Sequence, residues 1–293
     1  MRVALATCAP LPDGYEDDRL LARALEAAGA TARFEVWDDE RVDWESFDRV
    51  VVRSTWDYTD RREEFVAWAE RVGPRLENPA PLLRWNSDKR YLRELVAAGI
   101  PTVPTAFVEP GDPIPPLEGE VVVKPVVSAG ARDTGRFAPG AHPQARDLLE
   151  RLAREGRTAM IQPYLERVEI EGETAIVLFR GEASHVLRKG AVLGPDEEAP
   201  IREDELRAAA IMWEEDLVGP GEADTEQRRV AALVVDWLRA RFGRWPLYAR
   251  VDLLPGPDGA PVLGELEAVE PNFYFATSPG AAERFAAAVV AGA

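Results

Sequence analysis

Cysteine and histidine are scarce in this sequence of 293 residues. Its one cysteine, Cys8, has no partner for an internal disulfide, and nothing near it in the sequence suggests a reactive thiol. The two histidines, His142 and His185, give little support for a nucleophilic triad, and packing in a predicted strand is the expected role of His185. The scarcity therefore argues against disulfide stabilisation and against catalysis by such a triad.

Positive charge and long apolar runs are also in short supply. The sequence has 35 Lys and Arg residues against 52 Asp and Glu residues, a formal net charge of -17. Proteins that bind nucleic acid or anionic membranes normally carry the opposite sign, so neither is an expected partner. No apolar run approaches the roughly 20 residues that span a bilayer, and the N-terminal run is too short for a signal peptide. We expect a cytoplasmic protein whose oligomeric state, a homodimer included, the sequence leaves open.

The apolar residues that are present, 46% of the chain, suffice for more than one hydrophobic core. In the first 85 residues, short apolar strands alternate with helical spacing, which predicts an open α/β layer. The expected strands are 2–6, 31–36 and 49–53, and the expected helices are 17–28 and 61–72, with Phe65, Val66, Trp68 and Ala69 inward. Ligands on such layers bind beyond the carboxyl ends of the strands. Arg53, Ser54 and Trp56 stand at such an end, where substrate binding and a plain capped loop are equally compatible with the sequence.

A second series of elements follows from residue 86. The segment 86–89 begins a helix that Gly99 ends, and a hairpin is predicted at 174–188. Further expected strands are 105–108, 121–124 and 158–162, and further expected helices are 144–154, 225–242 and 281–290. The helix 225–242 should place Val230, Leu233, Val234, Trp237 and Leu238 on its inner face. The run 190–221 has no period and is expected to cover the site.

The segment 250–272 carries the most informative chemistry. Two alternating apolar runs joined by a turn predict a hairpin, in which a period of two places Glu265 and Glu267 on one face. Asp252, near the start of the partner strand, can join them. Converging carboxylates repel one another unless a cation lies between them, and hard oxygen ligands suit Mg2+ that bridges nucleotide phosphates. The apolar flanks favour this metal site over a solvated acidic strand face.

A second feature suits an anion. Lys124 ends an apolar strand directly before the loop 126–135, whose small residues let backbone amides approach an anion closely. Neither Gly-x-x-x-x-Gly-Lys-Ser/Thr nor Gly-x-Gly-x-x-Gly occurs, so this is not one of the commonest phosphate loops. Alone, the feature is a weak signal, and its meaning depends on the motifs around it.

Along the chain the motifs follow the order Lys89 with Gly99-Ile100-Pro101, Val123-Lys124-Pro125, Ile161-Gln162-Pro163-Tyr164-Leu165, Gly172-Glu173, and then Asp252, Glu265 and Glu267. Over nearly the whole chain, this order resembles the ATP-grasp superfamily. The segment 162–182 looks like glutathione-synthetase and RimK-like ligases. Most similar is the branch with the O-ureido-serine cyclo-ligase of D-cycloserine biosynthesis, an antibiotic pathway. The segments that carry this likeness are Arg53-Ser-Thr-Trp-Asp-Tyr, Trp85-Asn-Ser-Asp-Lys-Arg-Tyr-Leu and Glu265-Leu-Glu-Ala-Val-Glu-Pro.

The resemblance implies an α/β (α+β) ATP-grasp fold, in which an open α/β N-terminal domain at 1–85 precedes an ATP-grasp domain at 86–293. Residues 101–164 would form a lid-like subdomain, and two subdomains would clamp ATP between them. The implied ATP contacts are Lys89 and Lys124 on the α- and β-phosphates, Ser128 and Gly130 in the closing loop, Gln162, Pro163, Tyr164 and Leu165 in the adenine hinge, and Glu173 on the ribose. The trio Asp252, Glu265 and Glu267 would hold two Mg2+ ions.

The superfamily pattern leaves two points open. Its usual motif is Glu-x-Asn, whereas Glu267 stands where the asparagine is expected; Glu270 and Asn272 restore that motif in an alternative frame. The resemblance also implies that Arg188 lies near the transferring phosphoryl group, where it and Lys124 would be catalytic. For the neighbouring Lys189 we expect surface salt bridges to the acidic run 196–198.

The implied activity is that of an ADP-forming ligase. A small amino-acid-like carboxylate would attack the γ-phosphate, and an amine-type nucleophile would then displace phosphate from the acyl phosphate. The nucleophile can belong to the same molecule, as in the cyclisation of O-ureido-D-serine, or to another, as in an amino-acid or peptide ligase. Arg53, Ser54, Trp56 and Arg188 are the candidate substrate contacts. The alternatives are a phosphotransferase on the same fold and a non-catalytic nucleotide-binding module, against which the acidic trio argues.

Overall fold

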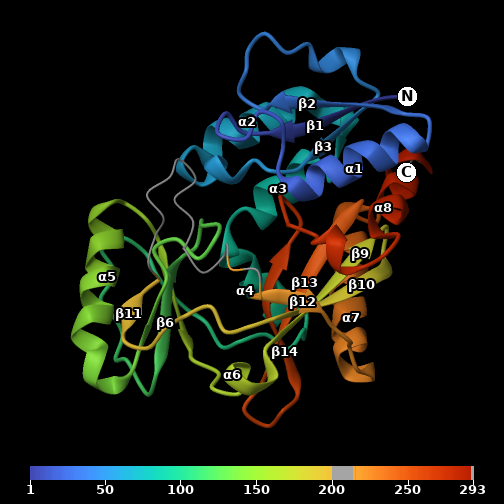
Figure 1. The fold of residues 1–293 in the computed structure, drawn as a ribbon. Helices are drawn as coiled ribbons and strands as arrows, with labels where there is room; N and C mark the ends of the chain where they lie inside the picture. Colours follow the sequence, from blue (N-terminus) through green and yellow to red (C-terminus); the bar gives the residue numbers. More distant parts are fainter. Residues whose placement is uncertain (200–213, 215, 292–293) are drawn as a thin grey trace.

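The computed structural model of the chain describes residues 1–199, 214 and 216–291, which form three β-sheets (Figure 1). The first sheet is parallel, with the strand order β2-β1-β3-β4. Its strands are β1 (Arg2–Thr7), β2 (Thr31–Val36), β3 (Arg49–Val52) and β4 (Leu76–Glu77), and its helices are α1 (Glu16–Ala27), α2 (Arg62–Val72) and α3 (Ala80–Asn86). The predicted open α/β layer is confirmed, while β4 and α3 are too short to show a period.

The second sheet has the order β11-β7-β6-β8-β5. Its strands are β5 (Ala106–Val108), β6 (Val121–Pro125), β7 (Gly135–Phe137), β8 (Ala159–Pro163) and β11 (Glu197–Glu198). Helix α5 (His142–Arg154) covers one face and buries Ala145, Leu148, Leu149 and Leu152 at helical spacing. The sequence predicted β5, β6, β8 and α5 but not the two-residue and three-residue strands β11 and β7.

The third sheet has the order β12-β10-β9-β13-β14. Its strands are β9 (Glu173–Phe179), β10 (Glu182–Lys189), β12 (Val218–Pro220), β13 (Tyr248–Pro255) and β14 (Pro261–Glu267). Both predicted hairpins are present, and a bulge after Asp252 keeps that residue opposite Glu265. Part of the run expected to cover the site, 200–213 and 215, lies outside the described residues.

Helix α7 (Thr225–Phe242) packs on this third sheet. It begins where predicted because Asp224 and Gln227 form a capping box, and it ends at Gly243, whose φ of 77° is left-handed. Val230, Val234 and Leu238 are buried as expected, but Leu233 is 39% exposed, because it lies at the edge of the apolar stripe. The remaining helices are α4 (Leu92–Ala97), α6 (Val168–Glu171) and α8 (Ala281–Ala291). No described helix is both long and apolar enough for a membrane span.

The end of the chain returns to the N-terminal layer. Helix α8 lies beside α1 (Figure 1), and Phe273 and Phe285 share a hydrophobic core with Val3 and Leu5. Asn78, just after the first sheet, donates to the carbonyl oxygens of Tyr248 (2.8 Å) and Ala268 (2.9 Å) and accepts from the Leu247 amide (2.7 Å). The first and third sheets are thereby joined by shared apolar packing and by buried hydrogen bonds.

Candidate active site

A cavity of about 320 Å³ is lined by strands of the second and third sheets and by loops, some of them from the N-terminal layer. Most of the residues predicted from the sequence for the site line it. They are Trp56, Lys89, Lys124, Ser128, Gly130, Gln162, Pro163, Tyr164, Leu165, Glu173, Asp252, Glu265 and Glu267. These side chains come from positions up to more than 200 residues apart in the sequence, and the fold brings them together around one cavity.

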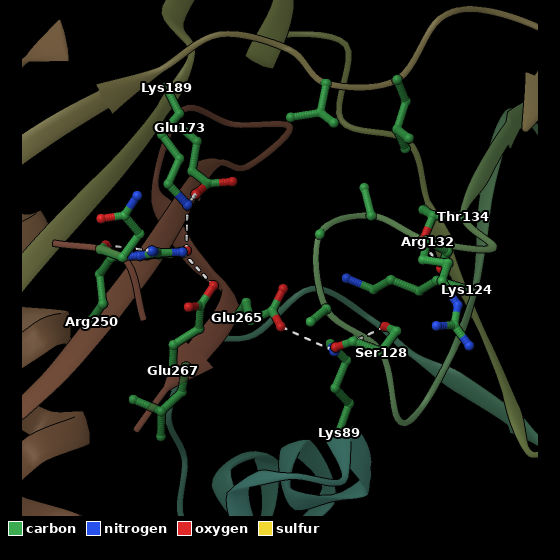
Figure 2. A pocket seen from close by; sticks show the side chains of 18 of the residues that line it. Lys89, Lys124, Ser128, Arg132, Thr134, Glu173, Lys189, Arg250, Glu265 and Glu267 are labelled. Carbon is green, nitrogen blue, oxygen red and sulfur yellow. Dashed lines mark hydrogen bonds and ion pairs between the residues drawn. The ribbon is translucent and has the colours of Figure 1, made fainter. Parts of the chain in front are cut away.

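Two lysines enter this cavity from different elements. Lys89 follows the capping residue Asp88, and its Nζ lies 2.8 Å from the carbonyl oxygen of Ser128 and 3.1 Å from the Glu265 carboxylate. Lys124, at the end of β6, extends into the cavity towards Glu265 (Figure 2). Within the described part of the chain, no side chain forms an ion pair with Lys124, and burial lowers the pKa of its ammonium group. Lys124 is therefore a cation available to an anionic ligand.

The acidic hairpin faces the cavity, but cationic side chains occupy its carboxylates. The Asp252 carboxylate lies 2.6 Å from Lys189 Nζ and 2.8 Å from Arg250 Nη2. Arg250 also forms an ion pair with Glu267, and Lys89 holds Glu265. The expected cation between converging carboxylates is thus supplied by side chains. No group of three or more Asp, Glu, His or Cys residues is close enough to share a metal ion in the ranges that the structure describes.

These cations set the protonation of the carboxylates. Burial raises the pKa of Asp252, but Arg250 and Lys189 outweigh burial and hold that pKa well below its usual range. Burial likewise opposes Lys89 and Lys124 at Glu265, whose pKa is lowered on balance. At Glu267 burial prevails over Arg250 and raises the pKa to about 7. The hairpin thus holds both firmly ionised carboxylates and one that gains a proton near neutral pH.

The structure corrects the predictions for Arg188 and Lys189. Arg188 is exposed, donates to the carbonyl oxygen of Ile170 (3.2 Å) and does not line the cavity. Lys189 does line it and pairs with Glu173 and Asp252 rather than with the run 196–198. Successive residues of a strand point to opposite faces, so only one of this pair can reach the cavity. The expected salt bridges of Lys189 are therefore wrong, and the catalytic role of Arg188 stays a prediction that its exposed position does not support.

Arg53 and Ser54 are a second correction. Both are buried, at 3% and 2% exposed, and neither lines the cavity. Arg53 Nε donates to the Asp18 carboxylate at 2.8 Å, and the Ser54 hydroxyl donates to the same carboxylate. The capped-loop alternative therefore holds for these two residues, while Trp56 reaches the cavity.

Comparisons with known proteins agree with this architecture. A family model described as the N-terminal domain of D-cycloserine synthetase DcsG matches residues 3–78. The chain is 37% identical over 302 aligned positions to the cycloserine biosynthesis protein DcsG of Streptomyces lavendulae, covering 98% of this chain and 97% of that protein. It belongs to the D-cycloserine synthetase family.

Solved structures show the fold of this family member. A crystal structure of D-cycloserine synthetase DcsG superposes with a TM-score of 0.85 at 34% identity and covers 99% of both chains. The D-alanine–D-alanine ligase of Bacillus anthracis in complex with ATP gives a TM-score of 0.67 at 13% identity, covering 99% of this chain and 96% of that one. An ATP-grasp RimK domain protein of Sphaerobacter thermophilus gives 0.63 at 17%, covering 99% and 100%. These likenesses show that the protein has the ATP-grasp fold, and its membership of the D-cycloserine synthetase family makes it a ligase.

The cavity of this synthetase-family enzyme also contains residues that the sequence analysis missed. They are Tyr15, Tyr58, Arg132, Lys189, Arg250 and Tyr274. Arg250 could have been found, because it stands two residues before Asp252 in the same strand and so faces the same side. Figure 2 shows Lys189, Glu173, Arg250 and Glu267 gathered on one side of the cavity, opposite Lys124 and Arg132. The cavity is thus lined by cations on two sides.

Two further predictions concern single hydrogen bonds. In the hinge, the Tyr164 amide donates to the carbonyl oxygen of Glu120 at 2.8 Å, so that amide is already used within the protein. In the alternative metal frame, the Asn272 side-chain oxygen accepts from the Tyr274 amide at 3.2 Å, and the Asn272 carbonyl oxygen accepts from Arg250 at 2.9 Å. Asn272 thus shapes the loop after β14, but Glu270 and Asn272 line the cavity as Glu265 and Glu267 do, so the choice between the two frames stays a prediction.

Proposed function

We propose that this ATP-dependent ligase activates a small amino-acid-like carboxylate as an acyl phosphate and closes it onto a nucleophile of the same molecule, as in the conversion of O-ureido-D-serine to D-cycloserine. One observation carries the proposal: Lys124, which has no ion pair among the described residues, faces the acidic hairpin and its cations across one cavity. Such an arrangement suits a triphosphate, whose charge needs cations on several sides. The family likeness supports a small-molecule substrate.

Magnesium is part of this proposal. Glu265 and Glu267 offer hard oxygen donors from one strand into the cavity, and Mg2+ is commonly held by one or two carboxylates together with substrate phosphates. Asp252 is a weaker candidate, because Arg250 and Lys189 already satisfy it. Bound Mg2+ would neutralise charge on the phosphates; a second ion, and a role for Asp252, stay predictions.

The residues of the chain would act by position and charge. Lys89 and Lys124 would bind the α- and β-phosphates, with Ser128 and Gly130 in the loop above them. Glu173 would accept from the ribose hydroxyls, and the hinge 162–165 would contact the adenine. Arg250 and Lys189 lie beside the hairpin carboxylates. In this proposal they would stabilise the charge that develops on the transferring phosphoryl group.

The proposed reaction balances in three steps. A carboxylate oxygen of the substrate attacks the γ-phosphorus and ADP leaves, which gives an acyl phosphate. The N–H nitrogen next to the ether-type oxygen attacks the acyl carbon, phosphate leaves, and the proton goes to phosphate or solvent. Water then removes the carbamoyl group from the ring nitrogen as carbamic acid. We place this reaction in the cytoplasm, in keeping with the use of ATP.

Purified enzyme with Mg2+, ATP and O-ureido-D-serine tests the proposal. The expected result is ADP, phosphate and the ring-closed product in equal amounts. Mass spectrometry would detect the ring-closed product, and a phosphate-release assay would measure the phosphate. A stable phosphorylated product without free phosphate would instead identify a phosphotransferase. Turnover only with a separate carboxylate and amine would identify an intermolecular ligase.

A further inference from the structure

One wall of the cavity combines aromatic rings with a carboxylate. It is formed by Tyr15, Trp56, Tyr58, Tyr274 and Glu270, which come from three separate segments of the chain. The rings of Tyr15 and Trp56 meet edge to face at 5.4 Å, and Trp56 Nε1 donates to the backbone oxygen of Glu270 at 3.3 Å. We call these five residues the aromatic wall.

Glu270 differs from the other cavity carboxylates in having no cation. Glu173, Asp252, Glu265 and Glu267 each form an ion pair, but over the described ranges none involves Glu270. Burial and the charge of Glu267 raise the pKa of Glu270 to about 8, against the charge of Lys89 and a hydrogen bond with Tyr58. A carboxyl group that has a neutral hydrogen-bond partner but no ion pair can gain a cationic partner from a ligand in the cavity.

The wall is held in place before any ligand arrives. Tyr274 has a left-handed backbone, with φ 51° and ψ 51°, which a residue other than glycine rarely adopts. The Asp17 carboxylate accepts from the amides on either side of it, Phe273 (3.2 Å) and Phe275 (2.6 Å). Backbone strain of this kind concentrates at ligand sites, because the surrounding structure fixes a side chain in a required position.

We propose that Glu270 binds the ammonium group of the amino-acid-like substrate, with Tyr15, Trp56 and Tyr274 as its aromatic surroundings. This inference rests on the proposed function and adds a specificity-determining residue to it. A carboxylate beside aromatic rings recognises a small cation by a charge-assisted hydrogen bond and by cation–π attraction. The substrate carboxylate is then left to face Arg250 and Lys189, the cations around the transferring phosphoryl group.

Calorimetry with two matched ligands tests the assignment without turnover. The enzyme, with Mg2+ and a non-hydrolysable ATP analogue, is titrated with O-ureido-D-serine and with its des-amino analogue, 3-(ureidooxy)propanoate. We expect the wild type to prefer the amino-bearing ligand about 10- to 100-fold, the range for a hydrogen bond to a charged group. Glu270→Gln should remove that preference and change the affinity for the ATP analogue less than about twofold. Glu270→Asp should keep most of the preference for the amino-bearing ligand.

Glu283→Gln is the matched control, because Glu283 is exposed on α8 and its loss removes the same charge away from the cavity. It should keep the wild-type preference. Equal binding of both ligands by the wild type, or an undiminished preference in Glu270→Gln, overturns the assignment. If thermal melting shows that Glu270→Gln does not fold, Trp56→Leu replaces it, with an expected loss of about 3- to 10-fold in preference; no loss then overturns the assignment.

ADP release, measured in parallel, separates the two proposals. A Glu270-dependent preference without ADP release would reject the cyclo-ligase and keep the ammonium site. Formation of the ring-closed product together with an unchanged preference in Glu270→Gln would keep the cyclo-ligase and reject the ammonium site.

Discussion

Replacing Lys189 with methionine tests the charge balance of the cavity. Its ammonium group lies 2.6 Å from Asp252 and pairs with Glu173, and the Lys189 and Asp252 side chains are 11% and 3% exposed. Removing one partner of a buried ion pair costs about 3–5 kcal/mol. Because Asp252 keeps its ion pair with Arg250, we expect a loss of unfolding free energy at the lower end of this range, about 3 kcal/mol. At about 2.1 cal/mol/K of unfolding entropy per residue, this corresponds to a fall in Tm of about 5 °C for a chain of this length.

The pH dependence of that loss has a definite sign. Burial raises the pKa of Glu173, and Lys189 opposes the rise, so the variant should have a Glu173 pKa that is higher still. A carboxyl whose pKa is higher in the folded state binds protons on folding, so the variant gains stability as the pH falls. Asp252, whose pKa is lowered in the folded state, loses its contribution only at more acidic pH. The stability gap between wild type and variant should therefore narrow from pH 8 to pH 5.

Urea and thermal unfolding between pH 5 and 8 measure both effects. Lys189→Arg keeps the charge and should recover most of the stability. Arg188→Ala is the control on the opposite strand face; its Tm should stay within about 1 °C of the wild type, and its rate of ADP release should be unchanged. A Lys189→Met variant as stable as the wild type at every pH would show that Lys189 does not neutralise Glu173 and Asp252.

Three further predictions follow from the same geometry. Lys124→Met should raise the KM for ATP about 100-fold without lowering Tm, because it removes a half-buried cation that has no ion pair within the described ranges. An unchanged KM in an ADP-release assay would contradict its phosphate role. Glu265→Gln should lower turnover at least about 100-fold while the Kd of a non-hydrolysable ATP analogue changes less than about fivefold. EDTA should stop turnover by the wild type until Mg2+ is restored. Full turnover by the variant, or by the wild type in EDTA, would reject the metal role. Asn78→Ala should lower the free energy of unfolding by about 3 kcal/mol, from three buried hydrogen bonds of about 1 kcal/mol each, with KM unaltered; urea denaturation that shows no loss would mean these bonds do not join the sheets.

The sequence alone predicted the features that depend on local spacing. A period of two placed Glu265 and Glu267 on one face of a strand, and the turn between two apolar runs predicted the hairpin that the structure contains. The spacing of Val230, Val234 and Leu238 predicted α7 from its first residue to its last. Such features need only neighbours along the chain, and the motif order built from them was enough to indicate the ATP-grasp fold.

The tertiary structure decided which of these local features share one site. Alternation along β10 separates Arg188 from Lys189, but only the packing of α7 and of the N-terminal layer determines which strand face borders the cavity. Arg53 and Ser54 bind the Asp18 carboxylate instead of lining the cavity. Asp18 lies 35 and 36 residues earlier in the chain, so no local sequence pattern predicts this pairing. The aromatic wall likewise joins segments more than 200 residues apart, because side-chain contacts depend on where the chain returns in space and not on spacing along it.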